Sequence, residues 1–135
     1  MISYEKLQVY QLSLDCVELA VEMVCDLPKG YSELNTQLKR AIFSVSLNIA
    51  EGAGKSGFLD KRRFYDIAKG SAMESAAISD ILYRIKLVDE VPYSKLKQTL
   101  HRIISMLTKL CFNLQQRAEE SEYGKRSRPR KTATD

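Results

Sequence analysis

Apolar residues recur at three- and four-residue spacing along most of this chain, which is the period of a helix buried on one side. The clearest stretch covers residues 34–54, and its apolar positions are Leu34, Leu38, Ala41, Ile42, Val45 and Ile49. Small residues lie between them and would let a neighbouring helix approach closely: Ala41, Ser44, Ser46 and Ala50. The stretch closes on Glu51-Gly52-Ala53-Gly54, where glycine permits the left-handed conformation that ends helices. We predict that residues 33–52 form the central helix of a bundle.

The same period predicts three further helices, at about residues 5–26, 59–88 and 95–117. In the first, the expected buried positions are Leu12, Cys16, Leu19, Ala20, Met23 and Leu27. In the third helix they are Phe64, Ile67, Ala68, Ser71, Ala72, Ser75, Ile78, Leu82 and Ile85. In the fourth they are Leu96, Leu100, Ile103, Leu107, Leu110, Cys111 and Leu114. Ser32 and Ser94 are expected N-caps, and Gly70 is expected at a close helix crossing.

Short connections between successive helices make them antiparallel. The predicted fold is all-α: an up-down-up-down antiparallel four-helix bundle over residues 1–123, followed by a disordered basic tail over residues 124–135. The length suits one domain with a single core. Apolar runs are too short for a membrane span, and the N-terminus lacks the layout of a signal peptide. We therefore expect no membrane association and a cytoplasmic location.

The net charge of +4 is concentrated at the C-terminus. Residues 124–135 hold five basic residues and one acidic residue, which accounts for the whole excess. Residues 1–123 therefore balance at 16 basic and 16 acidic side chains. This balance weakens any interpretation of the whole domain as a basic nucleic-acid binder. Within it, residues 4–27 carry −4 and residues 29–69 carry +4, so opposite charges could cross an interface between subunits.

Motifs for catalysis or for cofactor binding are missing from the sequence. A di-iron bundle needs Glu-x-x-His pairs, but the single histidine, His101, follows Gln98 at that spacing. The three cysteines, Cys16, Cys25 and Cys111, are expected to be buried reduced thiols. Asn48 and Glu51 lie one turn apart and could be an acid–base pair, although a structural hydrogen-bonded pair is favoured. We predict a non-enzyme without cofactor or metal.

Two basic features could contact phosphates. Lys95, Arg102 and Lys109 recur every seven residues and should line one face of the fourth helix. The tail adds five cations: Lys125, Arg126, Arg128, Arg130 and Lys131. The alternatives are a solvated helix face and a solubility tail. Further cations gather around the second and third helices, where a solvated surface is the simpler interpretation: Lys39, Arg40, Lys55, Lys61, Arg62, Arg63 and Lys69.

Several short motifs resemble one bacterial family. They are Leu7-x-Val9-Tyr10-Gln11, Leu27-Pro28, Gln37-Leu38-Lys39-Arg40-Ala41, Asn48-Ile49-Ala50-Glu51-Gly52 and Ala68-x-Gly70-Ser71-x-x-Glu74. Over residues 4–115 the chain is similar to the four-helix bundle proteins encoded by intervening sequences in large-subunit ribosomal RNA genes, often labelled S23. The resemblance implies a homopentamer, RNA association and no catalysis. That family is related to the accessory variability determinant of diversity-generating retroelements, a basic pentamer that binds reverse transcriptase and nucleic acid.

Three hypotheses follow. The first is a non-catalytic, oligomeric, nucleic-acid-associated scaffold of the ribosomal intervening-sequence type. The second is a retroelement accessory protein that binds reverse transcriptase and template RNA, for which the basic tail leaves room. The third is a purely structural oligomer. If the second and third helices form a hairpin centred near Ser56-Gly57, Arg40 should pair with Glu74, and Ser44 should face Gly70.

Overall fold

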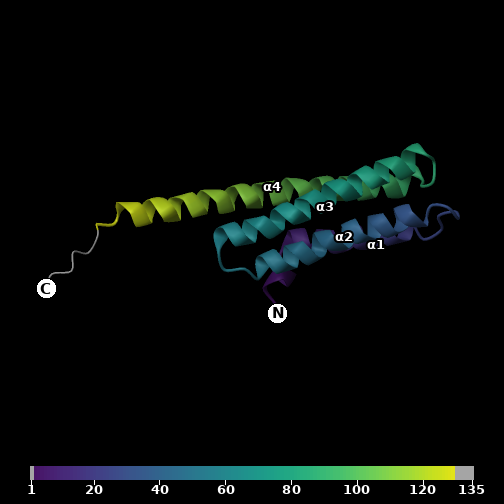
Figure 1. Cartoon of the computed structure of the whole chain (residues 1–135). Coiled ribbons are helices and arrows are strands. Elements are labelled where there is room, and N and C mark those ends of the chain that lie inside the picture. Colours follow the sequence, from purple (N-terminus) through teal and green to yellow (C-terminus); the bar gives the residue numbers. More distant parts are fainter. Residues whose placement is uncertain (1, 130–135) are drawn as a thin grey trace.

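The computed structural model describes residues 2–129 and confirms an all-helical bundle (Figure 1). A short 3-10 turn at Ser3–Lys6 precedes α1 (Gln8–Met23), α2 (Ser32–Ala53), α3 (Phe58–Arg84) and α4 (Glu90–Ser127). No strand occurs between residues 2 and 129. Each helix packs against the next along the chain, and α1 also packs against α4. The diagonal pairs, α1 with α3 and α2 with α4, do not pack together within the described residues. This is the predicted up-down-up-down arrangement.

The core draws on all four helices, and the predicted inner positions of α2 and α4 are confirmed. Leu38, Ile42, Val45 and Ile49 of α2 are fully buried, and so are Leu96, Leu100, Ile103 and Leu107 of α4. Leu34 and Leu110 are half-buried at the edge of the same core. These two helices have continuous apolar stripes, so their buried faces follow directly from the helical period.

The buried face of α1 is rotated from the predicted one. Cys16 and Ala20 are buried as expected, but the other buried positions are Val9, Ser13 and Val24. The larger side chains predicted inside lie half-buried at the rim: Leu12, Leu19, Met23 and Leu27. The reason is a polar contact, since Ser46 Oγ of α2 donates a 2.8 Å hydrogen bond to Ser13 Oγ. Ser13 in turn donates to the Tyr10 carbonyl oxygen, so a buried serine on this face is fully satisfied.

In α3 the prediction was wrong at two apolar positions, because Ile67 and Ile85 are both exposed. Tyr65 is buried instead. The helix ends at Arg84 rather than at Val88 because Lys86 adopts a left-handed conformation with φ 64°. The amide of Leu87 donates to the carbonyl of Leu82, and the amide of Lys86 donates to that of Tyr83. These two bonds form a Schellman motif, which satisfies carbonyl groups at the end of the helix.

Both expected serine caps are wrong. Tyr31 is the N-cap of α2, so Ser32 is its first helical residue. Asp89 is the N-cap of α4, and Ser94 lies inside that helix. Pro92 lies between the predicted third and fourth helices, but it occupies the first turn of α4, where the missing N–H has no intrahelical partner to lose.

The glycines at the end of α2 also differ from the prediction. Gly52 lies within the helix, and Gly54 follows it with φ −82°, which is not left-handed. Gly30, in the loop after α1, has the positive φ of 98°.

The helix α4 is much longer than predicted. It has 38 residues, about 57 Å of rise, and it continues four residues past Tyr123. Leu114 is its last buried residue. Residues 116–127, here called the arm, therefore project beyond the other helices (Figure 1). The first four residues of the expected disordered tail are helical, whereas Arg130 and Lys131 lie outside the described residues.

Candidate nucleic-acid interface

Asn48 and Ser71, which belong to the motifs that resemble the family, contact Ser44 between α2 and α3. Ser44 Oγ and Ser71 Oγ share a 2.8 Å hydrogen bond across the two helices. Asn48 Nδ2 donates to Ser44 Oγ at 3.0 Å and to the Ser44 carbonyl oxygen at 2.8 Å. The expected Asn48–Glu51 pair is therefore wrong: the Asn48 amide turns toward Ser44, and Glu51 is exposed. These polar groups hold a helix contact together and contribute no acid–base site.

Gly52 rather than Gly70 marks the close approach of α2 and α3. A Cβ atom at Gly52 would lie 2.8 Å from Tyr65 Cε1 and 3.1 Å from Phe64 Cβ. A Cβ atom at Gly70 would meet nothing within 4 Å. The expected crossing at Gly70 is wrong because this residue faces outward, whereas its neighbours Ser71 and Ala72 face α2 and the core.

The predicted Arg40–Glu74 ion pair is also wrong. Among the described residues, Glu74 accepts a 3.5 Å hydrogen bond from Gln37 Nε2, and Arg40 is exposed without contacting it. The hairpin register explains the difference. Ser44 lies opposite Ser71 rather than Gly70, a shift of one residue that turns Arg40 away from the seam.

The basic stripe of α4 lies beside the acidic side of α1. Lys95, Arg102 and Lys109 are all exposed. Lys95 shares a surface hollow with Asp15, Glu18 and Glu22. At the other end of the stripe, Lys109 lines a small apolar hollow with Leu7 and Gln8 of the N-terminal segment. Carboxylates next to Lys95 oppose an approaching phosphate, so this stripe is a poor nucleic-acid site at that end.

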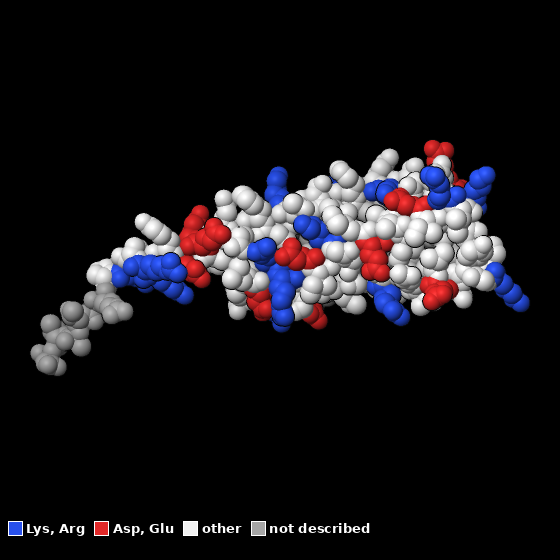
Figure 2. All heavy atoms as spheres, turned by 45° about the horizontal axis from the view of Figure 1, so that its top comes forward, with Lys and Arg blue, Asp and Glu red and all other residues white. Residues whose placement is uncertain are grey.

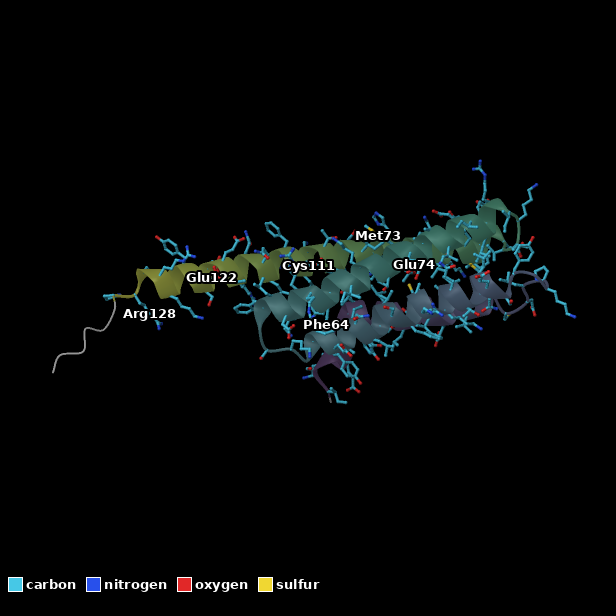
Figure 3. The ribbon with its side chains drawn as sticks, in the orientation of Figure 1. Phe64, Met73, Glu74, Cys111, Glu122 and Arg128 are labelled. Atoms are coloured by element: carbon cyan, nitrogen blue, oxygen red, sulfur yellow. The ribbon has the colours of Figure 1, made fainter. Side chains whose placement is uncertain are left out.

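The arm separates its charges along its length (Figure 2). Residues 117–122 of the arm carry Arg117 and three acids, Glu119, Glu120 and Glu122. Lys125 and Arg126 follow at its end, and Arg128 comes directly after it (Figure 3). At the root of the arm, Arg62 of α3 donates to Gln115 Oε1, and Gln115 Nε2 donates to Glu119 at 2.9 Å. The basic end thus stands clear of the acidic face of the bundle.

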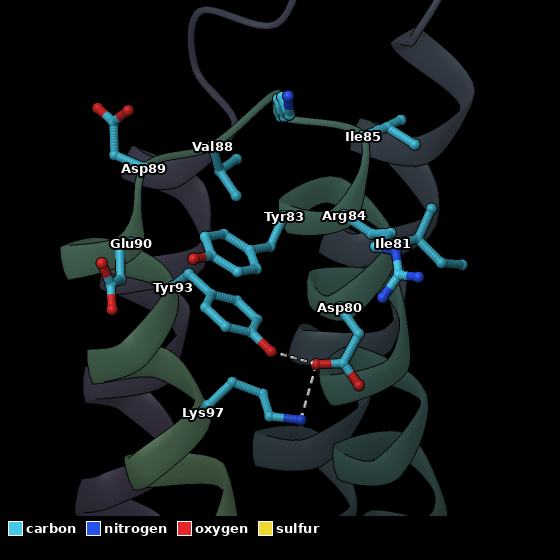
Figure 4. A pocket seen from close by; sticks show the side chains of 11 residues that line it. Asp80, Ile81, Tyr83, Arg84, Ile85, Val88, Asp89, Glu90, Tyr93 and Lys97 are labelled. Atoms are coloured by element: carbon cyan, nitrogen blue, oxygen red, sulfur yellow. Dashed lines mark hydrogen bonds and ion pairs between the residues drawn. The ribbon is translucent and has the colours of Figure 1, made fainter.

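A shallow hollow at the α3–α4 turn gathers aromatic and charged side chains (Figure 4). The rings of Tyr83 and Tyr93 stack with centroids 4.3 Å apart. Asp80 Oδ1 accepts from Tyr93 Oη at 2.6 Å and from Lys97 Nζ at 2.8 Å. Burial opposes ionisation of Asp80, but the bonds from Lys97 and Tyr93 outweigh it and lower the pKa of this carboxyl. Asp80, Tyr93 and Lys97 thus bond to one another, which is typical of a structural cluster.

The cysteines do not form a common site. All three are free, and burial raises the pKa of Cys16 to about 12 and that of Cys111 to about 11. These two thiols are therefore neutral at physiological pH and poor nucleophiles. Cys25 was expected to be buried but is exposed, because α1 ends at Met23 and the chain turns away.

Metal binding and membrane insertion find no support in the part of the chain that the structure describes. Over residues 2–129, no three histidine, cysteine or acidic side chains converge in a way that could hold a metal ion. None of the helices in that range is both long enough and apolar enough to cross a bilayer.

Comparison with known proteins identifies a family. Residues 5–109 match the family described as 23S rRNA-intervening sequence protein. A search of curated proteins found no match. The matched segment contains the α2–α3 contact and most of the core, and it ends before the arm.

Proposed function

Because this chain belongs to the family of 23S rRNA-intervening sequence proteins, we propose that it is a non-catalytic, oligomeric scaffold that associates with RNA in the cytoplasm. The observation that supports this proposal is the arm. Its end and the following residue carry Lys125, Arg126 and Arg128, which project from a bundle whose own charges balance. Long-range attraction to a polyanion therefore has to come from the arm, the tail or a local patch.

Exposed apolar side chains support self-association. One apolar face lies on α1 and α2 and contains Leu14, Phe43 and Leu47. Leu14 and Leu47 each follow one partner of the Ser13–Ser46 bond, so they lie at the same helix contact. A second face lies on α3 and contains Leu59, Ile67, Met73 and Ile81. Large exposed apolar patches are typical of interaction sites.

Two different apolar faces suit a head-to-tail contact, in which one face of a subunit meets the other face of the next. Such contacts close into a ring when the rotation between subunits allows it. We propose a homopentamer from the family resemblance, with the acidic α1 side and the basic residues of 29–69 contributing opposite charges across the interface.

The test of RNA association compares the full chain with a chain ending at Tyr123. Binding of a labelled single-stranded RNA is followed by fluorescence anisotropy over a range of salt concentrations. Each phosphate contact adds about −0.7 to the slope of log affinity against log salt. Removing residues 124–135 should therefore flatten the slope and weaken binding to all sequences alike. Reversal of the α4 stripe, with Lys95→Glu, Arg102→Glu and Lys109→Glu, is the matched control and should have the smaller effect.

The opposite result would show that the tail does not contribute to RNA binding. In that case truncation would leave the affinity and the salt slope unchanged, and the stripe variant would lower both.

The retroelement accessory role remains the second candidate, because basic groups beyond the matched segment suit a partner that itself holds RNA. Pull-down from native cells with RNA sequencing and protein identification separates the two. Ribosomal RNA alone supports the first role, and a reverse transcriptase with its template RNA supports the second.

A further inference from the structure

The turn between α2 and α3 is a locally basic region of the bundle itself. Residues 52–64 contain four cations, Lys55, Lys61, Arg62 and Arg63, against the single acid Asp60. The local net charge is therefore +3 in a body whose total is zero over residues 1–123. This region lies inside the matched family segment and is separate in sequence from the arm.

Two of the four cations have structural roles. Lys61 Nζ donates to the carbonyl oxygens of Gly52 at 3.1 Å and Ala53 at 2.9 Å, so it caps the end of α2. Arg62 pairs with Asp66 at 3.4 Å and donates to Gln115 at the root of the arm. Lysine near a helix C-terminus stabilises the last carbonyl groups, which explains Lys61 without any ligand.

The other two cations are positioned by an aromatic ring. Lys55 Nζ lies 5.1 Å from the centroid of the Phe64 ring, and Arg63 Cζ lies 4.8 Å from it. A cation–π contact orients a cation without cancelling its charge. Arg63 also pairs with Asp60 at 3.1 Å, but its side chain is 66% exposed. Within residues 2–129, no carboxylate lies within ion-pair distance of Lys55.

An exposed aromatic residue follows Lys55 by three positions in the chain. Phe58 begins α3 and is 38% exposed. Proteins hold single-stranded nucleic acid with cations that contact phosphates and with aromatic rings on which bases stack. A duplex keeps its bases stacked and offers none of them to such a ring.

We propose that Lys55, Arg63 and Phe58, here called the turn patch, bind single-stranded nucleic acid. This inference rests on the proposed association with RNA and assigns it a contact on the bundle itself. The Arg62–Gln115 bond joins the start of α3 to the root of the arm. The cations at the end of the arm lie about 18 Å of helix from this root. A nucleic-acid strand that they hold can therefore continue onto the turn patch.

The test uses the full chain and two double variants with the same change in charge. Lys55→Glu with Arg63→Glu alters the turn patch, and Lys39→Glu with Arg40→Glu alters α2 away from it. Anisotropy with a labelled single-stranded RNA should show affinity falling at least about tenfold for the patch variant and clearly less for the control. Circular dichroism should show both variants folded, since the altered charges are not part of the core. Lys55→Gln with Arg63→Gln provides a milder version of the same test.

A third variant tests the aromatic contact. Phe58→Ala should weaken binding of the single strand by about tenfold, and it should leave binding of a duplex of the same length unchanged. Equal losses for the patch and control variants would overturn the proposal, because net charge alone would then explain binding. Strong binding that survives the patch variant but is abolished by truncation at Tyr123 would also overturn it, while leaving the proposed function intact. If the unaltered chain binds no RNA, both proposals fail.

Discussion

At the scale of single residues, Gly52 leaves room for the buried ring of Tyr65. A methyl group there would lie 2.8 Å and 2.9 Å from two carbons of that ring, and Tyr65 is too buried to move aside freely. Gly52→Ala should therefore lower the free energy of unfolding by about 1–2 kcal/mol, because overpacking outweighs the better helix propensity of alanine. Urea denaturation of the two proteins measures the difference.

Gly70→Ala is the matched control. It makes the same chemical change in a helix interior, but the new methyl group would point into open space. This variant should be more stable than the parent by up to about 1 kcal/mol. Equal effects at the two glycines would contradict the packing described for Gly52.

Asp80 should make the stability of the bundle depend on acid pH. Because its pKa is lower in the folded chain than the ordinary value of 3.8, the unfolded chain binds more protons in the range between the two values. The stabilising contribution is therefore present above pH 3.8 and is lost as the pH falls through the folded-state pKa. Asp80→Asn keeps an acceptor for Tyr93 and removes the charge facing Lys97. Thermal melts across this range should show a shallower loss of stability in the variant, and an unchanged pH profile would argue against the Asp80–Lys97 contact.

At the scale of helices, the arm makes no buried contact beyond Leu114. Truncation after Ala118 should therefore change the free energy of unfolding by less than about 0.5 kcal/mol. Leu114→Ala, by contrast, should lower it by about 2–4 kcal/mol, since it empties a buried position. Hydrogen exchange should show amides of residues 119–127 exchanging much faster than those of residues 96–111. A large loss of stability on truncation would indicate that the arm folds back onto the bundle.

How much of each helix could be predicted from the sequence depends on what determines its buried face and its ends. The stripes of α2 and α4 are apolar throughout, so period alone identifies their buried faces. In α1, buried Ser13 gains its partner Ser46 only through the tertiary contact, and no local pattern reveals that. Lys86 ends α3 in a left-handed conformation that sequence would assign to glycine. Pro92 lies outside the predicted fourth helix, although proline is compatible with the first turn of α4.

The candidate site was less predictable than the fold. The sequence identifies the cations, but it does not show that Lys95 lies beside acids of α1 or that Lys61 caps α2. Those facts depend on which helices are neighbours and on their register. The one-residue shift that places Ser44 opposite Ser71 is also what removes the expected Arg40–Glu74 pair.

At the scale of the whole molecule, the two apolar faces predict how the proposed assembly could be broken. Leu47 is 66% exposed on α2, and Ile67 is exposed on α3. Leu47→Glu or Ile67→Glu should each convert the assembly of 15.4 kDa subunits to monomers without unfolding them, because neither side chain belongs to the core. Light scattering of the parent and of each variant measures this. Tyr123→Glu, on the exposed arm, is the control and should leave the assembly intact.

Mixing the two variants tests the geometry of the contact. In a head-to-tail interface each variant retains one intact face, so an equimolar mixture should form dimers and no larger species. Rings that survive in both variants, or a parent protein that is monomeric at micromolar concentration, would exclude this assembly.

The packing of α1 against α4 joins the first helix to the last, and this has a consequence for the order of folding. The α2–α3 hairpin closes a loop of only a few residues, whereas α1 and α4 can meet only after most of the chain is in place. Contacts between neighbours along the chain form early, since closing a longer loop loses more entropy. Substitutions at Ser44 and Ser71 should therefore mainly slow refolding, whereas Leu12→Ala in α1 should mainly speed unfolding. Stopped-flow measurements of both rates would show whether the first helix is the last to dock and the first to leave.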